Sequence, residues 1–155
     1  MSSNALTIYT IGHGRHPFEY FVELLRRHRI AFVCDVRSIA RSRWPQYNGR
    51  ALAEALRASG IGYEHLPECG GKVIAPPDEL ARGLDRIVEL ASEMRVAVMC
   101  SESQPLTRHT TAPRANCHRV GLLAVPLKAR GVDVIHILPD GEALECDESA
   151  LPSIW

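Results

Sequence analysis

The stretch Val96-Ala97-Val98-Met99-Cys100-Ser101-Glu102 decides the fold class, because a short apolar run stops abruptly at reactive and polar residues. An apolar run of this length, bounded by polar loop residues, is typical of a strand buried on both faces, as in parallel sheets. In open α/β sheets, ligands bind in the crevice beyond the carboxyl ends of the strands. The sequence therefore predicts that any chemistry lies where this strand ends.

Four other apolar segments predict strands, and segments with apolar residues at helical spacing alternate with them. The predicted strands are residues 6–11, 30–36, 61–66 and 132–138. We expect Asp78 to cap the third helix and Pro126 to kink the fourth. This alternation favours an α/β three-layer sandwich with a mainly parallel sheet of about five strands. Residues 1–155 are expected to form a single domain, with its core over residues 6–138 and a C-terminal tail over 139–155.

Composition excludes several classes of protein. Lys plus Arg (18) equal Asp plus Glu (18), so net charge gives no reason to expect a non-specific nucleic-acid or membrane binder. No apolar run is long enough to span a bilayer, and the N-terminus lacks signal-peptide character. Five cysteines without close paired spacing favour reduced thiols. We expect a cytoplasmic protein without a cofactor or a membrane partner, and a homodimer remains open.

Reactive residue types follow four of the predicted strands. Because parallel strands end at one edge of a sheet, their loops should open together there. The candidates for catalysis are His13, Cys100, Glu102 and Cys117. The candidates for substrate binding are Gly12, Asp35, Arg37, Arg43, Gly70, Gly71, His118 and Arg119.

Each candidate has a structural alternative. Cys100 is either a small buried hydrophobic residue or a thiol nucleophile activated by nearby arginines. Cys117, in the first turn of a predicted helix, either packs that helix or gains thiolate character from the helix N-terminus. Asp35 and Arg37 are as consistent with a structural ion pair as with anion binding. Glu102 is a base, a carboxylate nucleophile or a salt-bridge partner, whereas His136, inside an apolar strand, suits a core histidine.

Known ligand motifs are absent from the sequence. Cys100, Cys117, His118 and His13 are acceptable zinc ligands, but no Cys-x2-Cys or His-x3-His spacing occurs, so no metal site is predicted. Neither a phosphate-binding P-loop nor a dinucleotide-type glycine fingerprint is present.

Several short motifs in order resemble the prokaryotic domain-of-unknown-function family numbered 488. The motifs are Thr10-Ile11-Gly12-His13, Asp35-Val36-Arg37, Ser42-Arg43, Gly70-Gly71, Met99-Cys100-Ser101-Glu102 and Cys117-His118-Arg119. The resemblance covers roughly residues 6–138, and the family name implies no activity. The chain departs from the family pattern at Ala40 and Cys69, and in a longer loop between Glu102 and Cys117.

The leading hypothesis is an enzyme that acts on a small anionic or nucleotide-like substrate. Arginines would hold the anion, Cys100, Cys117 or Glu102 would attack, and Glu102 or His13 would move protons. The first alternative is a nucleic-acid-binding module that uses the Arg, Trp and Tyr side chains of loop 41–47. The second is a zinc-supported structural or binding protein.

Overall fold

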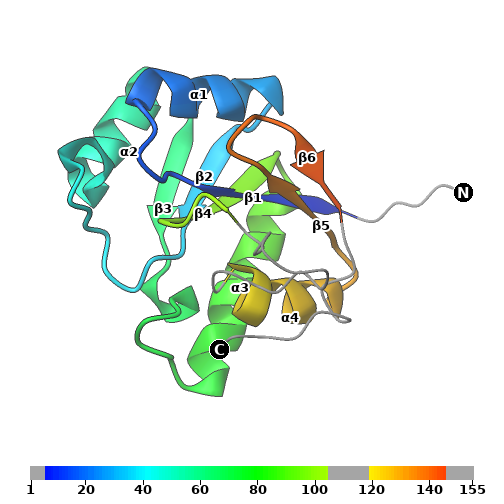
Figure 1. Ribbon diagram of the computed structural model, residues 1–155. Helices are drawn as coiled ribbons and strands as arrows, with labels where there is room; N and C mark the ends of the chain where they lie inside the picture. The colour runs from blue at the N-terminus through cyan, green and yellow to red at the C-terminus, as the bar shows by residue number, and fades with distance from the viewer. Residues whose placement is uncertain (1–5, 105–118, 146–155) are drawn as a thin grey trace, which may run out of the picture.

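A six-stranded, mostly parallel sheet forms the centre of the molecule in the computed structural model, which describes residues 6–104 and 119–145 (Figure 1). The strand order is β3-β2-β4-β1-β5-β6. The strands are β1 (Thr7–Gly12), β2 (Phe32–Asp35), β3 (Gly62–His65), β4 (Val96–Cys100), β5 (Asp133–Ile137) and β6 (Ala143–Leu144). The predicted parallel strands are confirmed with bounds that differ by at most two residues at either end, and β6 adds an antiparallel edge strand.

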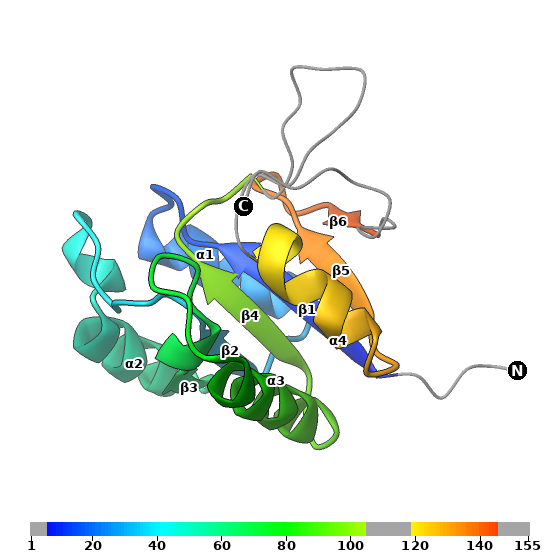
Figure 2. The same ribbon diagram turned by 90° about the horizontal axis from the view of Figure 1, so that it is seen from below.

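Helices cover both faces of the sheet and complete the predicted three layers (Figure 2). Helices α1 (Phe18–Arg27) and α2 (Gly49–Ala58) pack on one face, which we call the α1–α2 face. Helices α3 (Pro77–Ala91) and α4 (Val125–Lys128) pack on the other, the α3–α4 face. Three short helical turns join these elements: η1 (Pro45–Tyr47), η2 (Pro67–Cys69) and the π-helical η3 (Arg119–Ala124).

Strand β4 lies in the middle of the sheet, between β1 and β2, and all its residues are buried. Successive side chains of a strand point to opposite faces. Val98 and Cys100 accordingly join the core beneath α3 and α4, whereas Ala97 and Met99 join the core beneath α1 and α2. A shift of one position along the chain therefore moves a side chain into the other layer.

One expectation about a helix start is wrong. Helix α3 starts at Pro77, two residues earlier than a cap at Asp78 would place it, with Pro76 as its N-cap residue. Proline suits this position because its fixed φ is helical and its missing N–H needs no partner in the first turn. Pro126 lies in the first turn of α4, directly after the π-helical η3, and the kink expected there stays a prediction. Helix α2 ends before Gly60, whose φ of +81° is one that glycine adopts readily.

None of the helices in the described part of the chain is long and apolar enough to cross a membrane.

Candidate functional site

The loops after β1 and β4 continue the pairing of these strands past their ends. The backbone N–H of His13 donates to the Cys100 carbonyl oxygen at 3.0 Å, and that of Gly14 donates to Ser101 at 2.8 Å. Gly12 permits this approach, because a β-carbon at position 12 would lie 1.7 Å from the Glu102 carbonyl oxygen. The glycine predicted to bind substrate thus serves first to bring loop 101–103 against the end of β1.

The sheet divides the predicted site residues between its two faces. His13, Asp35 and Arg37 lie on the α1–α2 face, where His13 stacks on Tyr47. Cys100 lies on the α3–α4 face, in the core. All of them reach the same edge of the sheet, as predicted, but they form two groups instead of one.

On the α1–α2 face, Asp35 and Arg37 form a buried, bidentate ion pair. Nε and Nη2 of Arg37 donate to the two carboxylate oxygens of Asp35 at 2.9 and 2.7 Å. The Tyr63 hydroxyl donates to Oδ2 of the same carboxylate at 2.5 Å. Burial opposes the charge of Arg37, but its hydrogen bonds to Asp35 outweigh burial and raise its pKa. Burial, together with the negative charge of Asp35, also raises the pKa of Tyr63, so the hydroxyl keeps its proton and remains a donor.

The backbone around this pair is fixed as well. Nη1 of Arg37 reaches the Arg41 carbonyl oxygen at 3.4 Å, and the His65 Nε2–H donates to the carbonyl oxygen of Arg37 at 2.7 Å. Each of the three guanidinium nitrogens of Arg37 thus makes a hydrogen bond within the chain, which favours the structural ion pair.

Gly70 joins the loops after β2 and β3. A β-carbon at Gly70 would lie 2.2 Å from Oγ of Ser38, and this oxygen also accepts the N–H groups of Lys72 and Val73. The buried Gly70 therefore faces another part of the chain.

His13 is a neutral imidazole with one unused nitrogen. It is 2% exposed and stacks on Tyr47, with ring centroids 4.3 Å apart. Its Nδ1–H donates to the Gly14 carbonyl oxygen at 2.8 Å. Burial lowers its pKa to about 4, so at pH 7 Nε2 carries a lone pair. This buried Nε2 has no hydrogen-bond partner in the described chain. Most buried polar atoms are paired, so the exception marks His13 as a candidate for ligand binding.

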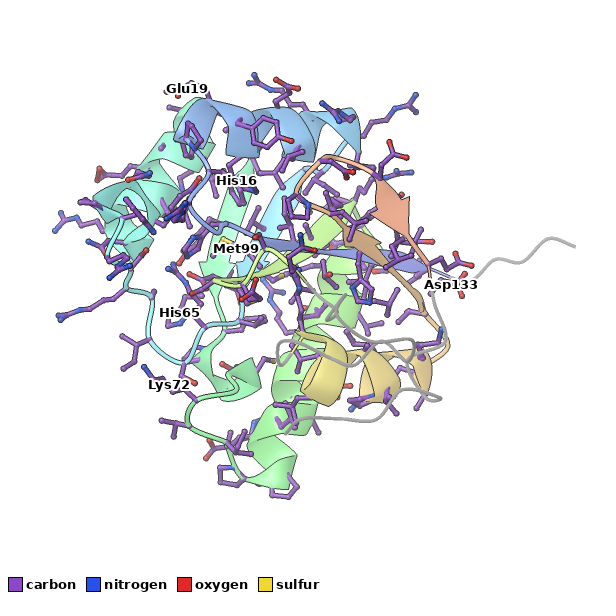
Figure 3. All side chains as sticks on the ribbon, in the orientation of Figure 1. His16, Glu19, His65, Lys72, Met99 and Asp133 are labelled. Atoms are coloured by element: carbon purple, nitrogen blue, oxygen red, sulfur yellow. The ribbon has the colours of Figure 1, made fainter. Side chains whose placement is uncertain are left out.

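A pocket of about 510 Å³ lies between residues 14–17, which follow His13 in the chain, and residues 101–103. Glu102 is exposed in its wall, and its Oε1 accepts the backbone N–H of Gln104 at 2.9 Å. Arg15 and His16 line the opposite side. His16 lies near α1 (Figure 3). Burial lowers its pKa, and its Nε2 has no partner among the described residues. The pocket thus combines an exposed carboxylate, a cationic side chain and a neutral imidazole.

On the α3–α4 face, Cys100 and Arg119 contact successive carbonyl groups of loop 101–103. The Cys100 thiol donates to the Glu102 carbonyl oxygen at 3.6 Å. Nη2 of Arg119 donates to that of Ser103 at 3.4 Å. Arg119 is 0% exposed, yet its Nε and Nη1 have no partner in the parts of the chain that the structure describes. A guanidinium cannot lose its proton in a protein, so it remains a buried charge with unused donors.

The remaining candidates differ in their surroundings. Cys117 and His118 lie outside the described residues, and their roles remain predictions. Arg43 is exposed, 6.0 Å from the centre of the Trp44 ring. His136 is a core histidine, as expected, paired through Nδ1 with Thr10 Oγ1 at 2.7 Å. Over residues 6–104 and 119–145, no group of three His, Cys, Asp or Glu side chains is placed to hold a metal ion.

Four residues of these networks, Tyr47, Tyr63, His16 and His65, were not among the predicted catalytic or substrate-binding residues. Tyr63 and His65 lie two positions apart on β3, so both point to the same face and contact Asp35 and Arg37. This contact depends on the pairing of β3 with β2. Tyr47 was assigned to nucleic-acid stacking, yet it is fully buried and bonded through its hydroxyl to the His16 carbonyl oxygen. His16 comes two residues after the Gly12-His13-Gly14 motif, so this motif could have indicated His16 as a site residue.

The fold and site define an α/β protein with a polar cleft at the carboxyl edge of its sheet. Residues 17–78 match the model of a protein family described as Domain of unknown function DUF488, which supports the resemblance inferred from the motifs. The match includes Asp35 and Arg37 but neither His13 nor Cys100. No curated protein and no solved structure matches the chain.

Proposed function

We propose that the protein is an enzyme that acts on a small anionic or nucleotide-like substrate in the pocket between residues 14–17 and 101–103. The observation that carries the proposal is this pocket itself, which the exposed Glu102 lines together with Arg15 and His16. The residue before the pocket, buried and neutral His13, has an Nε2 without a partner among the described residues. A histidine held in one tautomer by a backbone carbonyl suits recognition of a hydroxyl or amino group of a substrate. Arg15 would attract the anion, and Glu102 would act as the nucleophile or as the base that activates water.

Glu102 is a better nucleophile candidate than Cys100 on geometric grounds. Its carboxylate is exposed in the pocket wall, where a substrate can reach it. The Cys100 thiol is 3% exposed and packs in the core on the opposite face of the sheet. Thiol chemistry would require the loop above Cys100 to move first.

The test is a turnover assay on a panel of nucleoside 5′-monophosphates and sugar phosphates, with release of base or phosphate followed by chromatography. We expect the native protein to turn over one of these compounds, and Glu102→Gln to lower kcat by at least about 100-fold. Glu93→Gln, which changes an exposed glutamate after α3, is the matched control and should leave kcat unchanged. Full activity in Glu102→Gln together with loss of activity in Cys100→Ser would show that the nucleophile is the Cys100 thiol and not the Glu102 carboxylate. Absence of turnover across the panel would count against the proposal.

A nucleic-acid-binding module is the second candidate, because loop 41–47 presents two exposed arginines, Arg41 and Arg43. No carboxylate occurs between Asp35 and Glu54, and Arg43 lies over the Trp44 ring. Tyr47 is buried, so only Trp44 remains to stack on a base. Fluorescence anisotropy with a single-stranded oligonucleotide tests this candidate: binding should weaken steeply with salt and in Arg41→Gln/Arg43→Gln. Salt-independent binding, or no binding at low salt, would exclude it.

A further inference from the structure

Arg119 is a buried cation for which the described chain offers almost no partner. Its side chain has five N–H donors. Among residues 6–104 and 119–145, its one hydrogen bond is the contact of Nη2 with the Ser103 carbonyl oxygen, at a long 3.4 Å. Nε and Nη1 are buried and have no partner in the described structure. Folded proteins rarely retain such a group unless something outside the chain satisfies it.

The surroundings of this guanidinium suit a small oxyanion. The salt bridges of the described residues do not include Arg119, so its charge is not neutralised by a carboxylate there. Arginine binds carboxylate and phosphate groups with two parallel N–H donors, and Arg119 retains enough free donors to do so. Ser103, which accepts the one bond, contacts Gly12, where a side chain would be excluded.

We infer that Arg119 binds the phosphate or carboxylate group of a small ligand on the α3–α4 side of loop 101–103. The inference deepens the proposed function, on which it rests in taking this anion to be part of the substrate. Loop 101–103 would then separate two parts of one ligand. Its anionic group would lie next to Arg119 and the Cys100 thiol, and its reacting group next to the Glu102 carboxylate. This arrangement explains why Gly12 lets loop 101–103 approach so closely, since one short loop then contacts both parts.

The test measures binding without turnover, so its failure is distinct from failure of the enzyme proposal. The melting temperature of the full chain is recorded in potassium phosphate, in potassium acetate and in potassium chloride of equal ionic strength. Phosphate or acetate should raise it by at least about 2 °C over chloride. A rise with phosphate identifies a phosphorylated ligand, and a rise with acetate alone identifies a carboxylate.

Two variants make the result specific. Arg119→Met should lose the anion-dependent rise, and in chloride it should melt at or above the native temperature, because it removes an unpaired buried charge. Arg50→Met, which changes a 94% exposed arginine, should keep the full rise. The inference is overturned if neither anion raises the melting temperature, if Arg119→Met retains the rise, or if Arg119→Met melts below the native protein in chloride.

Discussion

Two buried arginines, one on each face of the sheet, make opposite use of their donors. Arg37 is 5% exposed, and all three of its nitrogens are hydrogen-bonded, two of them to Asp35. Arg119 is 0% exposed, and two of its three nitrogens have no partner in the described structure. Burial alone therefore does not distinguish a structural arginine from one available to a ligand. The number of satisfied donors does, because an unsatisfied buried charge destabilises the folded state unless a ligand compensates it.

The largest effect on stability should come from removing the charged partner of Arg37, which would leave it a buried, unpaired charge like Arg119. Asp35→Asn removes the charge that neutralises Arg37 and leaves the guanidinium buried. We expect a loss of about 3–5 kcal/mol in the free energy of unfolding, measured by urea denaturation. Asp133→Asn changes an exposed aspartate of β5 and should cost less than about 0.5 kcal/mol. Equal stability of the two variants would mean that the Asp35–Arg37 pair does not hold this edge together.

The second largest effect on stability should come from low pH, through protonation of His13 on the α1–α2 face. Its pKa in the folded protein is about 4, below the usual value of 6.5, so the unfolded chain binds the proton more readily. The stabilisation is therefore complete above about pH 6.5 and is lost as the pH falls toward 4, by on the order of 2–3 kcal/mol.

Two measurements check this contribution. NMR titration of the His13 imidazole should give a midpoint near pH 4. His13→Gln should flatten the stability profile between pH 6.5 and 4. A midpoint near 6.5 would show that His13 is solvated, and would also weaken the proposal that its Nε2 is reserved for a ligand.

Tyr63→Phe should have the smallest effect, because it removes one donor to Asp35 and leaves the three hydrogen bonds from Arg37, two from its guanidinium and one from its backbone N–H. A hydrogen bond to a charged group contributes roughly 1.5–3 kcal/mol, and we expect the lower end because the carboxylate remains paired. Tyr20→Phe, which removes the hydroxyl that donates to the Pro139 carbonyl oxygen, is the matched control for a neutral acceptor. The loss in Tyr63→Phe should exceed that in Tyr20→Phe, and the reverse order would show that the Asp35 carboxylate does not depend on Tyr63.

Local patterns predicted the architecture well. Segments rich in apolar residues and bounded by polar loops identified the five parallel strands, most clearly β4, which is buried on both faces and apolar throughout. Right-handed crossovers then place all their loops at one edge, so His13, Asp35 and Cys100 were correctly expected there. The start of α3 was missed because Pro76 and Pro77, rather than Asp78, occupy the N-cap and first helical positions, where the fixed φ of proline fits and its missing N–H is not needed.

The sequence by itself determined which reactive residues reach the carboxyl edge of the sheet, and only the tertiary structure decided which of them meet. A strand that is apolar throughout carries no polar alternation, so nothing local tells which face Cys100 takes. Likewise, the contact of Tyr63 with Asp35 depends on the register between β3 and β2, which long-range packing sets. Arg37 finds its carboxylate two residues away, so the sequence could already offer the Asp35–Arg37 ion pair. The contact of Arg119 with Ser103 instead depends on how loop 101–103 packs against η3, which only the tertiary structure decides.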